Sequence, residues 1–227
     1  TLNYKNDEES GQIIISGVGE LHLEIIADRL NREFKVPVKL GKPQVSYRET
    51  ITKAVIQSGM FDKPINGKNT YGEVVLKLEP GNSGSGINVT FDLGLDKIPA
   101  LYRQPIETGV REALSLGPNG YPMIDIKVLV QDIKTEDQKQ NEIAFKIAAS
   151  IAVKDGVRKA SPILMEPFCD LEIISPEEYT GDIIADLSSR RGKIERIEPQ
   201  GTMQAIKSQA PLSEMFGYVT KLRSASI

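Results

Sequence analysis

The sequence predicts an α+β fold made of short strands and amphipathic helices. Two observations predict it. Hydrophobic residues alternate with polar ones in several short runs, as in half-buried strands, and between these runs they recur at helical spacing. The 227 residues contain 40% hydrophobic side chains, which is enough for more than one small core. Changes in these patterns divide the chain into segments 1–43, 44–162 and 163–227.

Segment 1–43 is predicted to contain a strand at 12–16, a helix at about 20–33 and a second strand at 36–40. The helix has one apolar face, formed by Leu23, Ile26, Ala27, Leu30 and Phe34. One helix and two strands cannot enclose a core in so short a segment. We therefore expect this segment to need further chain or a partner.

Segment 44–162 begins with β-type patterning. Its strands are predicted at 45–57, 71–78 and 87–93, in an antiparallel sheet with one face in solvent. Two stretches rich in Lys, Asn, Gly, Ser or Pro, 61–70 and 80–86, are interpreted as loops.

The second half of this segment is predicted to hold two helices and a strand. The helices lie at about 102–117 and 141–155, with the strand at 124–131 between them. The second helix is apolar nearly all round, except for a polar stripe of Lys146, Ser150 and Lys154. Such a helix is expected to be largely buried against the sheet.

Segment 163–227 is predicted to run strand, helix, strand, strand, helix. The strands are expected at 163–174, 193–198 and 203–210, and the last helix at 213–223. Ser175-Pro176-Glu177-Glu178 has the pattern of a capping box that begins the first helix. This order is that of a split βαβ, ferredoxin-like unit without its final strand. We therefore expect the natural chain to continue beyond Ile227.

The composition points away from several functional classes. With one His and one Cys, His22 and Cys169, neither a disulfide within the chain nor a His/Cys metal site is expected. No phosphate-binding P-loop pattern occurs, and no apolar stretch is long enough to span a membrane. The net charge of -3 gives no general attraction to nucleic acid. We assign no catalytic, cofactor-binding or metal-binding residue.

Three motifs in separate segments carry a family resemblance. They are Ser16-Gly-Val-Gly-Glu-Leu-His-Leu-Glu-Ile-Ile-Ala-Asp-Arg-Leu30, Gly41-Lys-Pro-Gln-Val-Ser-Tyr-Arg-Glu-Thr50 and Pro211-Leu-Ser-Glu-Met-Phe-Gly-Tyr218. Together they resemble the bacterial-type elongation factor G family of translational GTPases. Several motifs in the family's order are far more specific than any one of them.

The resemblance implies a domain assignment. Residues 1–43 would be the second half of domain III, 44–162 domain IV, and 163–227 domain V without its final strand. Domain IV would have a left-handed βαβ fold like the second domain of a ribosomal protein, and the flanking segments would be incomplete ferredoxin-like units. The GTPase domain would precede Thr1. The chain itself is thus not expected to be an enzyme, and GTP and Mg²⁺ are expected only in the full-length parent.

The resemblance also implies a function. The parent would be a cytoplasmic, monomeric factor that binds the ribosome and uses GTP hydrolysis to move tRNA and mRNA, without a membrane partner. Domain IV would enter the ribosomal A site in the small-subunit decoding region, and the factor would also contact the large-subunit factor-binding region.

Residues that contact RNA are expected in two places. The tip of domain IV would be formed by loops around 96–99, 116–122 and 132–140. Its contact residues would be Lys97, Asn119, Tyr121, Lys134, Thr135, Glu136 and Lys139. In domain V, Arg190, Arg191 and Lys193 are candidate rRNA contacts. For these three, a role as cations at a helix C-terminus is equally well supported by the sequence.

Three departures from the family pattern leave alternatives open. Glu136 stands where family members often carry a tip His, and the family's Gly-Gln-Tyr-Gly-His reads Asn69-Thr-Tyr-Gly-Glu73. The family's Gly-Tyr-Pro loop is shortened to Gly117-Pro-Asn-Gly-Tyr-Pro122. A divergent paralogue specialised in ribosome recycling or ribosome protection is therefore an alternative. A free-standing RNA-binding module is a further alternative, disfavoured by the acidic charge balance. A small-molecule kinase is rejected because no glycine-rich phosphate loop precedes a helix.

Overall fold

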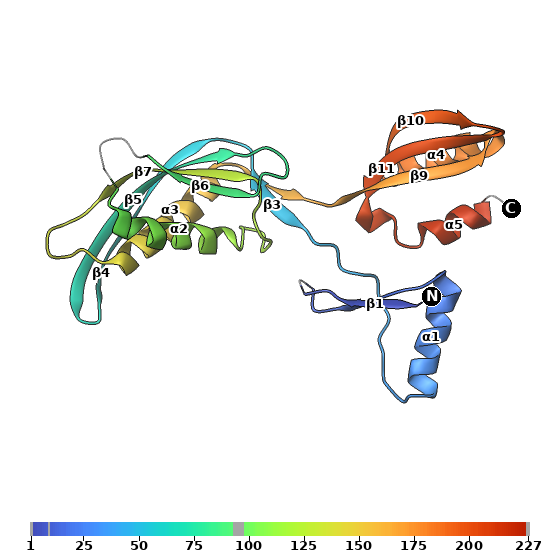
Figure 1. Cartoon of the computed structure of the whole chain (residues 1–227), viewed down its shortest axis with the longest axis horizontal. Coiled ribbons are helices and arrows are strands. Elements are labelled where there is room, and N and C mark those ends of the chain that lie inside the picture. The colour runs from blue at the N-terminus through green and yellow to red at the C-terminus, as the bar shows by residue number, and fades with distance from the viewer. Residues whose placement is uncertain (1, 9, 93–97, 226–227) are drawn as a thin grey trace. The chain divides into compact units, whose positions relative to one another are not determined.

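A computed structural model describes residues 2–8, 10–92 and 98–225 of the chain (Figure 1). The chain has a mixed α+β fold, as the sequence predicted. It divides into two compact units, one formed by Tyr47–Met165 and the other by residues 1–46 and 166–227. We call the first the central unit. Residues 1–46 are described below as the N-terminal segment, and residues 166–227 as the C-terminal unit.

The N-terminal segment contains a hairpin and a helix. Strands β1 (Asn3–Asn6) and β2 (Ile13–Ser16) pair antiparallel, and α1 (Glu20–Arg32) follows. Strand β1 was not predicted from the sequence. The predicted face of α1 is its less exposed side, with Ala27 buried, but Phe34 beyond the helix end is 65% exposed.

The strand predicted at 36–40 is wrong. Lys35 has a φ of 53°, which ends the helical path. The Val36 amide then donates to the Leu30 carbonyl at 3.0 Å, and the Val38 amide donates to Asn31 Oδ1 at 3.1 Å. These backbone groups bond to the helix end and its side chains instead of a neighbouring strand.

The central unit contains a four-stranded sheet in the order β4-β5-β7-β6. Its strands are β4 (Val55–Ile65), β5 (Lys68–Pro80), β6 (Ile87–Phe91) and β7 (Ile126–Lys134). The first three in sheet order are antiparallel, but β6 runs parallel to β7, so the prediction of an antiparallel sheet is wrong for β6. Helix α2 (Ala100–Leu114) makes the crossover that parallel neighbours require.

The stretch 61–70 was predicted to be a loop, and this is wrong. Strands β4 and β5 stay paired as far as Ile65 and Lys68. The turn between them consists of Asn66 and Gly67, which have φ values of 50° and 78°. Positive φ at both central residues is typical of the tight turns that Asn-Gly favours in hairpins.

Helix α3 (Glu142–Lys159) packs on β4 and β5, which confirms the prediction of a buried helix (Figure 1). Glycines in the two strands allow a close approach. A Cβ on Gly59 would lie 2.2 Å from the Ala148 carbonyl oxygen, and one on Gly72 would lie 3.2 Å from Phe145. The core of the unit forms between this helix, α2 and the sheet, and its largest fully buried side chains include Phe145, Leu76, Leu78, Ile106 and Ile126.

A second, two-stranded sheet joins the two ends of the central unit. Strand β3 (Arg48–Ile51) pairs antiparallel with β8 (Pro162–Met165). The strand predicted at 45–57 is therefore broken between β3 and β4. The strand predicted at 163–174 is likewise broken, and its first residues belong to the central unit.

The C-terminal unit has a three-stranded antiparallel sheet in the order β10-β11-β9. Its elements are β9 (Phe168–Pro176), a 3-10 turn (Glu177–Tyr179), α4 (Thr180–Ser189), β10 (Lys193–Gln200), β11 (Met203–Pro211), a 3-10 turn (Leu212–Glu214) and α5 (Tyr218–Ala225). The predicted order of strands and helices is present. Its core contains Ile173, Ile183, Leu187, Ile206 and Tyr218.

Two helix boundaries in this unit differ from the prediction. Ser175 does not cap a helix, because it lies within β9, where it pairs with Gln204, and its hydroxyl donates to the Pro176 carbonyl. The helix predicted from 213 begins only at Tyr218. Gly217, with a φ of 76°, separates it from the preceding turn.

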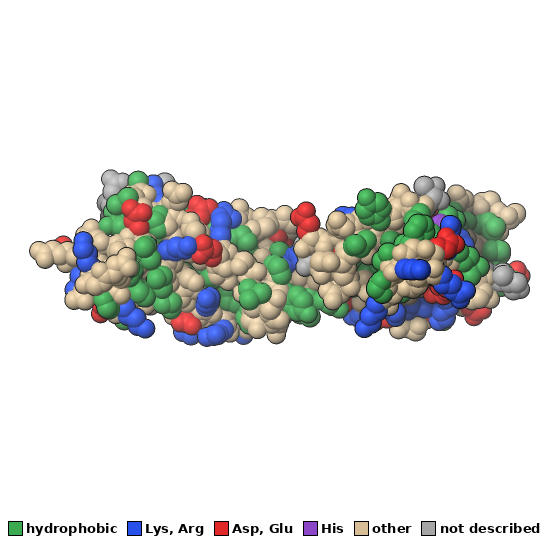
Figure 2. All heavy atoms as spheres, turned by 90° about the horizontal axis from the view of Figure 1, so that it is seen from below, with side chains coloured by type: hydrophobic (Ala, Val, Ile, Leu, Met, Phe, Trp, Pro, Cys, Tyr) green, Lys and Arg blue, Asp and Glu red, His purple; other side chains and the backbone are tan. Residues whose placement is uncertain are grey.

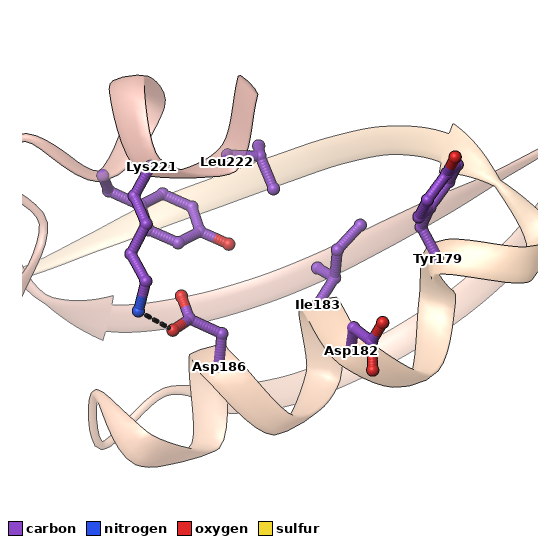
Figure 3. Close-up of a pocket in the computed structure, with 7 residues that line it drawn as sticks. Tyr179, Asp182, Ile183, Asp186, Lys221 and Leu222 are labelled. Atoms are coloured by element: carbon purple, nitrogen blue, oxygen red, sulfur yellow. Dashed lines mark hydrogen bonds and ion pairs between the residues drawn. The ribbon is translucent and has the colours of Figure 1, made fainter. Parts of the chain in front are cut away.

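Helices α4 and α5 are linked by charged groups beside a small cavity of about 90 Å³ (Figure 3). Asp186 on α4 accepts hydrogen bonds from Lys221 on α5 and from Arg190. The bond from Lys221 is the main reason that the pKa of Asp186 lies below its usual range. Arg190 also lies 4.9 Å from the centre of the Tyr218 ring, so this contact and the Lys221–Asp186 ion pair both tie α5 to the end of α4.

Gly59→Ala is expected to destabilise the central unit by about 2 kcal/mol. The added Cβ would meet backbone atoms of α3, which cannot turn away as a side chain can. Urea-dependent hydrogen exchange at the β5 amides measures the change. Ser58→Ala on the exposed side of the same strand is the control and is expected to stay within about 0.5 kcal/mol. Equal effects of both substitutions would contradict the close-approach argument.

Asp186→Asn is expected to weaken hydrogen-exchange protection of α5 by about 1–2 kcal/mol at neutral pH. The folded-state pKa of Asp186 is depressed, so its contribution is present above the unfolded-state value and is lost as pH falls through the folded-state value. The parent and the variant should therefore converge in acid. Asp182→Asn, on the same helix and without an ion pair among the described residues, is the control. A difference that persists unchanged at low pH would refute this assignment.

Candidate functional site

The candidate site is one end of the central unit, which we call the hairpin end. It consists of residues 61–71 around the β4–β5 turn and the loop 132–141, and both lie at the same end of the sheet (Figure 1). The Tyr71 amide donates to the Lys139 carbonyl at 3.0 Å. This backbone bond joins the hairpin to the loop, so the two present one surface.

The loop is also anchored to both helices of the unit. Asn141 caps α3, because its side chain accepts a hydrogen bond from the Ile143 amide at 2.8 Å. The Tyr102 hydroxyl on α2 donates to Gln140 Oε1 at 2.9 Å. The loop therefore runs from the end of β7 to the first turn of α3. Its C-terminal end, at Gln140 and Asn141, is held by both hydrogen bonds.

Glu73 binds two neighbours at this end. Its carboxylate pairs with Lys134 at 3.1 Å and accepts a hydrogen bond from the Tyr71 hydroxyl at 3.2 Å. Burial, and next the hydrogen bond to Glu73, raise the pKa of Tyr71, so its hydroxyl stays protonated as a donor. The Glu73 side chain is only 16% exposed, against 60% for Lys134, so the carboxylate is the shielded partner of this pair.

Glu136 pairs with the second lysine of the loop. The Lys139 ammonium lies 2.6 Å from Glu136 Oε2, and this hydrogen bond is the main reason that the pKa of Lys139 is raised. Thr135 and Asp137 are exposed beside the pair. Both lysines that the sequence analysis assigned to RNA contact in this loop are therefore bound to carboxylates of the same unit.

The hairpin contributes two cations that the sequence analysis missed. Lys63 and Lys68 are exposed, and within the described part of the chain neither has an ion-pair partner. Interpreting 61–70 as a loop separated them from the site. The Asn66-Gly67 dipeptide between two β-type runs is the signal that could have identified a projecting hairpin.

Asn119 and Tyr121 do not belong to this site, so the predicted grouping of three loops is wrong. Their amides, and Asn119 Nδ2, donate to the fully buried carboxylate of Glu49 on β3 at 2.9–3.0 Å. This places loop 116–122 at the C-terminal end of α2, about 22 Å from its other end. Figure 1 shows it close to β3. Lys97 lies outside the described residues.

The candidates in the C-terminal unit lie around the end of α4. Arg190 is 17% exposed and donates to Asp186 and to the Glu214 carbonyl, while Arg191 pairs with Glu166 and Glu214. Lys193 is exposed at the start of β10. The two arginines therefore make contacts within the unit. These contacts favour a structural role for the arginines at the helix end over a role as phosphate contacts.

Among the described residues, no group of three or more His, Cys, Asp or Glu side chains could hold a metal ion. No helix of the described chain is long and apolar enough to cross a bilayer. On the face of the central unit seen in Figure 2, Lys and Arg side chains are interspersed with Asp and Glu. Any RNA contact must therefore depend on local placement of cations.

Family models match the chain in three consecutive parts. Residues 1–42 match the model described as Elongation Factor G, domain III, residues 43–161 match Elongation factor G, domain IV, and residues 163–227 match Elongation factor G C-terminus. The domain IV match alone covers more than half of the chain.

Whole-chain relatives agree with these matches. The chain is 49% identical to elongation factor G of Thermotoga neapolitana and 47% identical to that of Thermotoga maritima, in each case over 100% of the chain and 33% of the relative. A crystal structure of a protein from Thermus thermophilus aligns with a TM-score of 0.85 and 34% identity, over 99% of this chain and 34% of that one. The chain thus spans about a third of the length of these proteins. It belongs to the elongation factor G family.

Proposed function

We propose that the chain is part of a cytoplasmic elongation factor G that promotes GTP-dependent translocation of tRNA and mRNA. The hairpin end of the central unit would enter the ribosomal A site in the small-subunit decoding region. GTP and Mg²⁺ would bind a catalytic domain elsewhere in the parent, and the partners would be rRNA, tRNA and mRNA. The parent would act as a monomer.

One observation carries the proposal: hairpin and loop are fixed to each other and to α3. The Tyr71–Lys139 backbone bond and the Asn141 cap leave little conformational entropy for this surface to lose when it binds. A stiff end of this kind can occupy a site by contact and by excluded volume. It needs no bound nucleotide of its own.

The cations of the hairpin end are the proposed RNA contacts. Lys63 and Lys68 have no internal partner in the described chain, and hence they are available to phosphates without breaking an existing ion pair. Lys134 and Lys139 remain proposed contacts that first have to leave Glu73 and Glu136. Thr135 and Glu136 would lie at the same contact.

A second role, ribosome recycling or ribosome protection, is favoured by the same two ion pairs. They reduce the positive charge that loop 132–140 presents to RNA. A factor specialised in this way would split ribosomes faster than it moves tRNA. Parallel measurements of ribosome splitting and of single-turnover translocation with the full-length factor separate the two roles.

Lys63→Ala combined with Lys68→Ala in the full-length factor is expected to slow single-turnover translocation about tenfold. The reason is the loss of two exposed phosphate contacts, together worth about 1.4 kcal/mol. Stopped-flow translocation kinetics, with melting temperature as a check on folding, measure the effect. Lys127→Ala, an exposed lysine at the other end of the same sheet, is the matched control and should leave the rate unchanged. A parental rate in the double variant would remove the hairpin from the proposed contact.

A further inference from the structure

The loop at the hairpin end has its positive charges bound internally. Loop 132–141 contains two lysines, Lys134 and Lys139, and each forms an ion pair with a carboxylate of the same unit. The remaining charged groups of the loop are Asp132, Glu136 and Asp137. Counting Glu73 with them, the acids outnumber the bases.

The two ion pairs differ in which partner is shielded from solvent. Glu73 is shielded from solvent and also accepts the Tyr71 hydroxyl, so losing Lys134 would leave a poorly solvated carboxylate without its cation. In the Glu136–Lys139 pair the two side chains are 46% and 36% exposed and the contact is shorter, 2.6 Å against 3.1 Å for Lys134, whose own side chain is 60% exposed. Each lysine is therefore bound to a carboxylate, and each pair has one or both partners open to solvent.

These contacts affect how the hairpin end meets a polyanion. An RNA phosphate that approaches either loop lysine has to compete with a carboxylate already bound to it, and that carboxylate lies next to the phosphate as a like charge. Other acids add to this, because Asp62 faces Lys139 from the hairpin and Asp132 lies at the end of β7. The only cations of this end without such a contact are Lys63 and Lys68, in the described part of the chain.

We propose that Glu73 and Glu136 are specificity-determining residues that hold Lys134 and Lys139 away from phosphates and so lower the affinity of the hairpin end for RNA in general. Stable binding is then restricted to an RNA surface that engages the hairpin lysines and also replaces the two carboxylates. The proposal rests on the proposed function in one respect, namely that the hairpin end is the surface that contacts RNA.

The test compares the full-length factor with its Glu73→Gln, Glu136→Gln variant. Glutamine keeps a hydrogen-bond acceptor for Tyr71 and removes the charge, so the fold should be preserved. Affinity for an RNA duplex of about 20 base pairs is measured between about 50 and 200 mM salt. The variant is expected to bind about tenfold more tightly at the lowest salt. Its plot of log affinity against log salt should be steeper by about 1.8, because two lysines are freed.

Glu79→Gln is the matched control. Glu79 pairs with Lys77 at 2.8 Å on the same sheet but at the other end of β5, so this variant changes the net charge without touching the hairpin end. It should bind the duplex as the parent does. Unchanged affinity and slope in the double variant would overturn the proposal, and so would an equal gain in Glu79→Gln, since the effect would then be one of net charge.

Two further results keep the outcomes distinct. If Glu73→Gln lowers the melting temperature, Glu136→Gln alone, in the exposed loop, is expected to give about half of the change in slope; no change there overturns the proposal.

If duplex affinity rises as expected but Lys63→Ala, Lys68→Ala leaves translocation unaffected, the charge mechanism stands. In that case the proposed translocation role of the hairpin end fails.

Discussion

The close contact between α3 and the sheet is the constraint on which the central unit depends. A helix can approach a strand so closely only where the strand carries no Cβ, and Gly59 faces the backbone of α3 at Ala148 and Ala152. Small side chains on the helix complete the fit. Because α3 is fixed along its length, its first turn at Asn141 is fixed as well, and with it the end of loop 132–141. The packing of the core thus positions a surface loop.

The same constraint explains why the hairpin end behaves as one surface. The β4–β5 hairpin projects past the point where α3 begins, and Gly72, just beyond Tyr71, faces the first turn of that helix. The hairpin and the loop therefore meet beside the helix start, where the Tyr71 amide finds the Lys139 carbonyl. Glu73, the next residue along the strand, can then reach Lys134 across the sheet, because the two residues are paired in register.

Sequence patterns predicted what depends on local periodicity. The buried helix, the strand at 71–78 within β5 and the order of elements in the C-terminal unit all follow from spacing along the chain. The sequence did not reveal features set by tertiary contacts. Residues 36–40 have a β-like pattern, but the amides of Val36 and Val38 bond to the end of α1. Ser175 has a helix-capping pattern but lies within β9, where it pairs with Gln204 of β11. The direction of β6 depends on the crossover by α2, which no local pattern encodes.

The candidate site was only partly predictable for a related reason. Residue type identifies which side chains can contact a phosphate, but their availability depends on partners that are distant in the sequence. Lys134 pairs with a residue on another strand, and Arg191 pairs with Glu166 from before β9. Asn119 was assigned to the tip by its loop character, yet it binds Glu49, which is seventy positions away along the chain. Conversely, Lys63 and Lys68 were predicted to be loop residues, but they lie on an antiparallel hairpin, and neither forms an ion pair with an acid of the described chain. Charge that faces a partner is therefore what remains after internal pairing, and at the hairpin end it lies on the hairpin rather than on the loop.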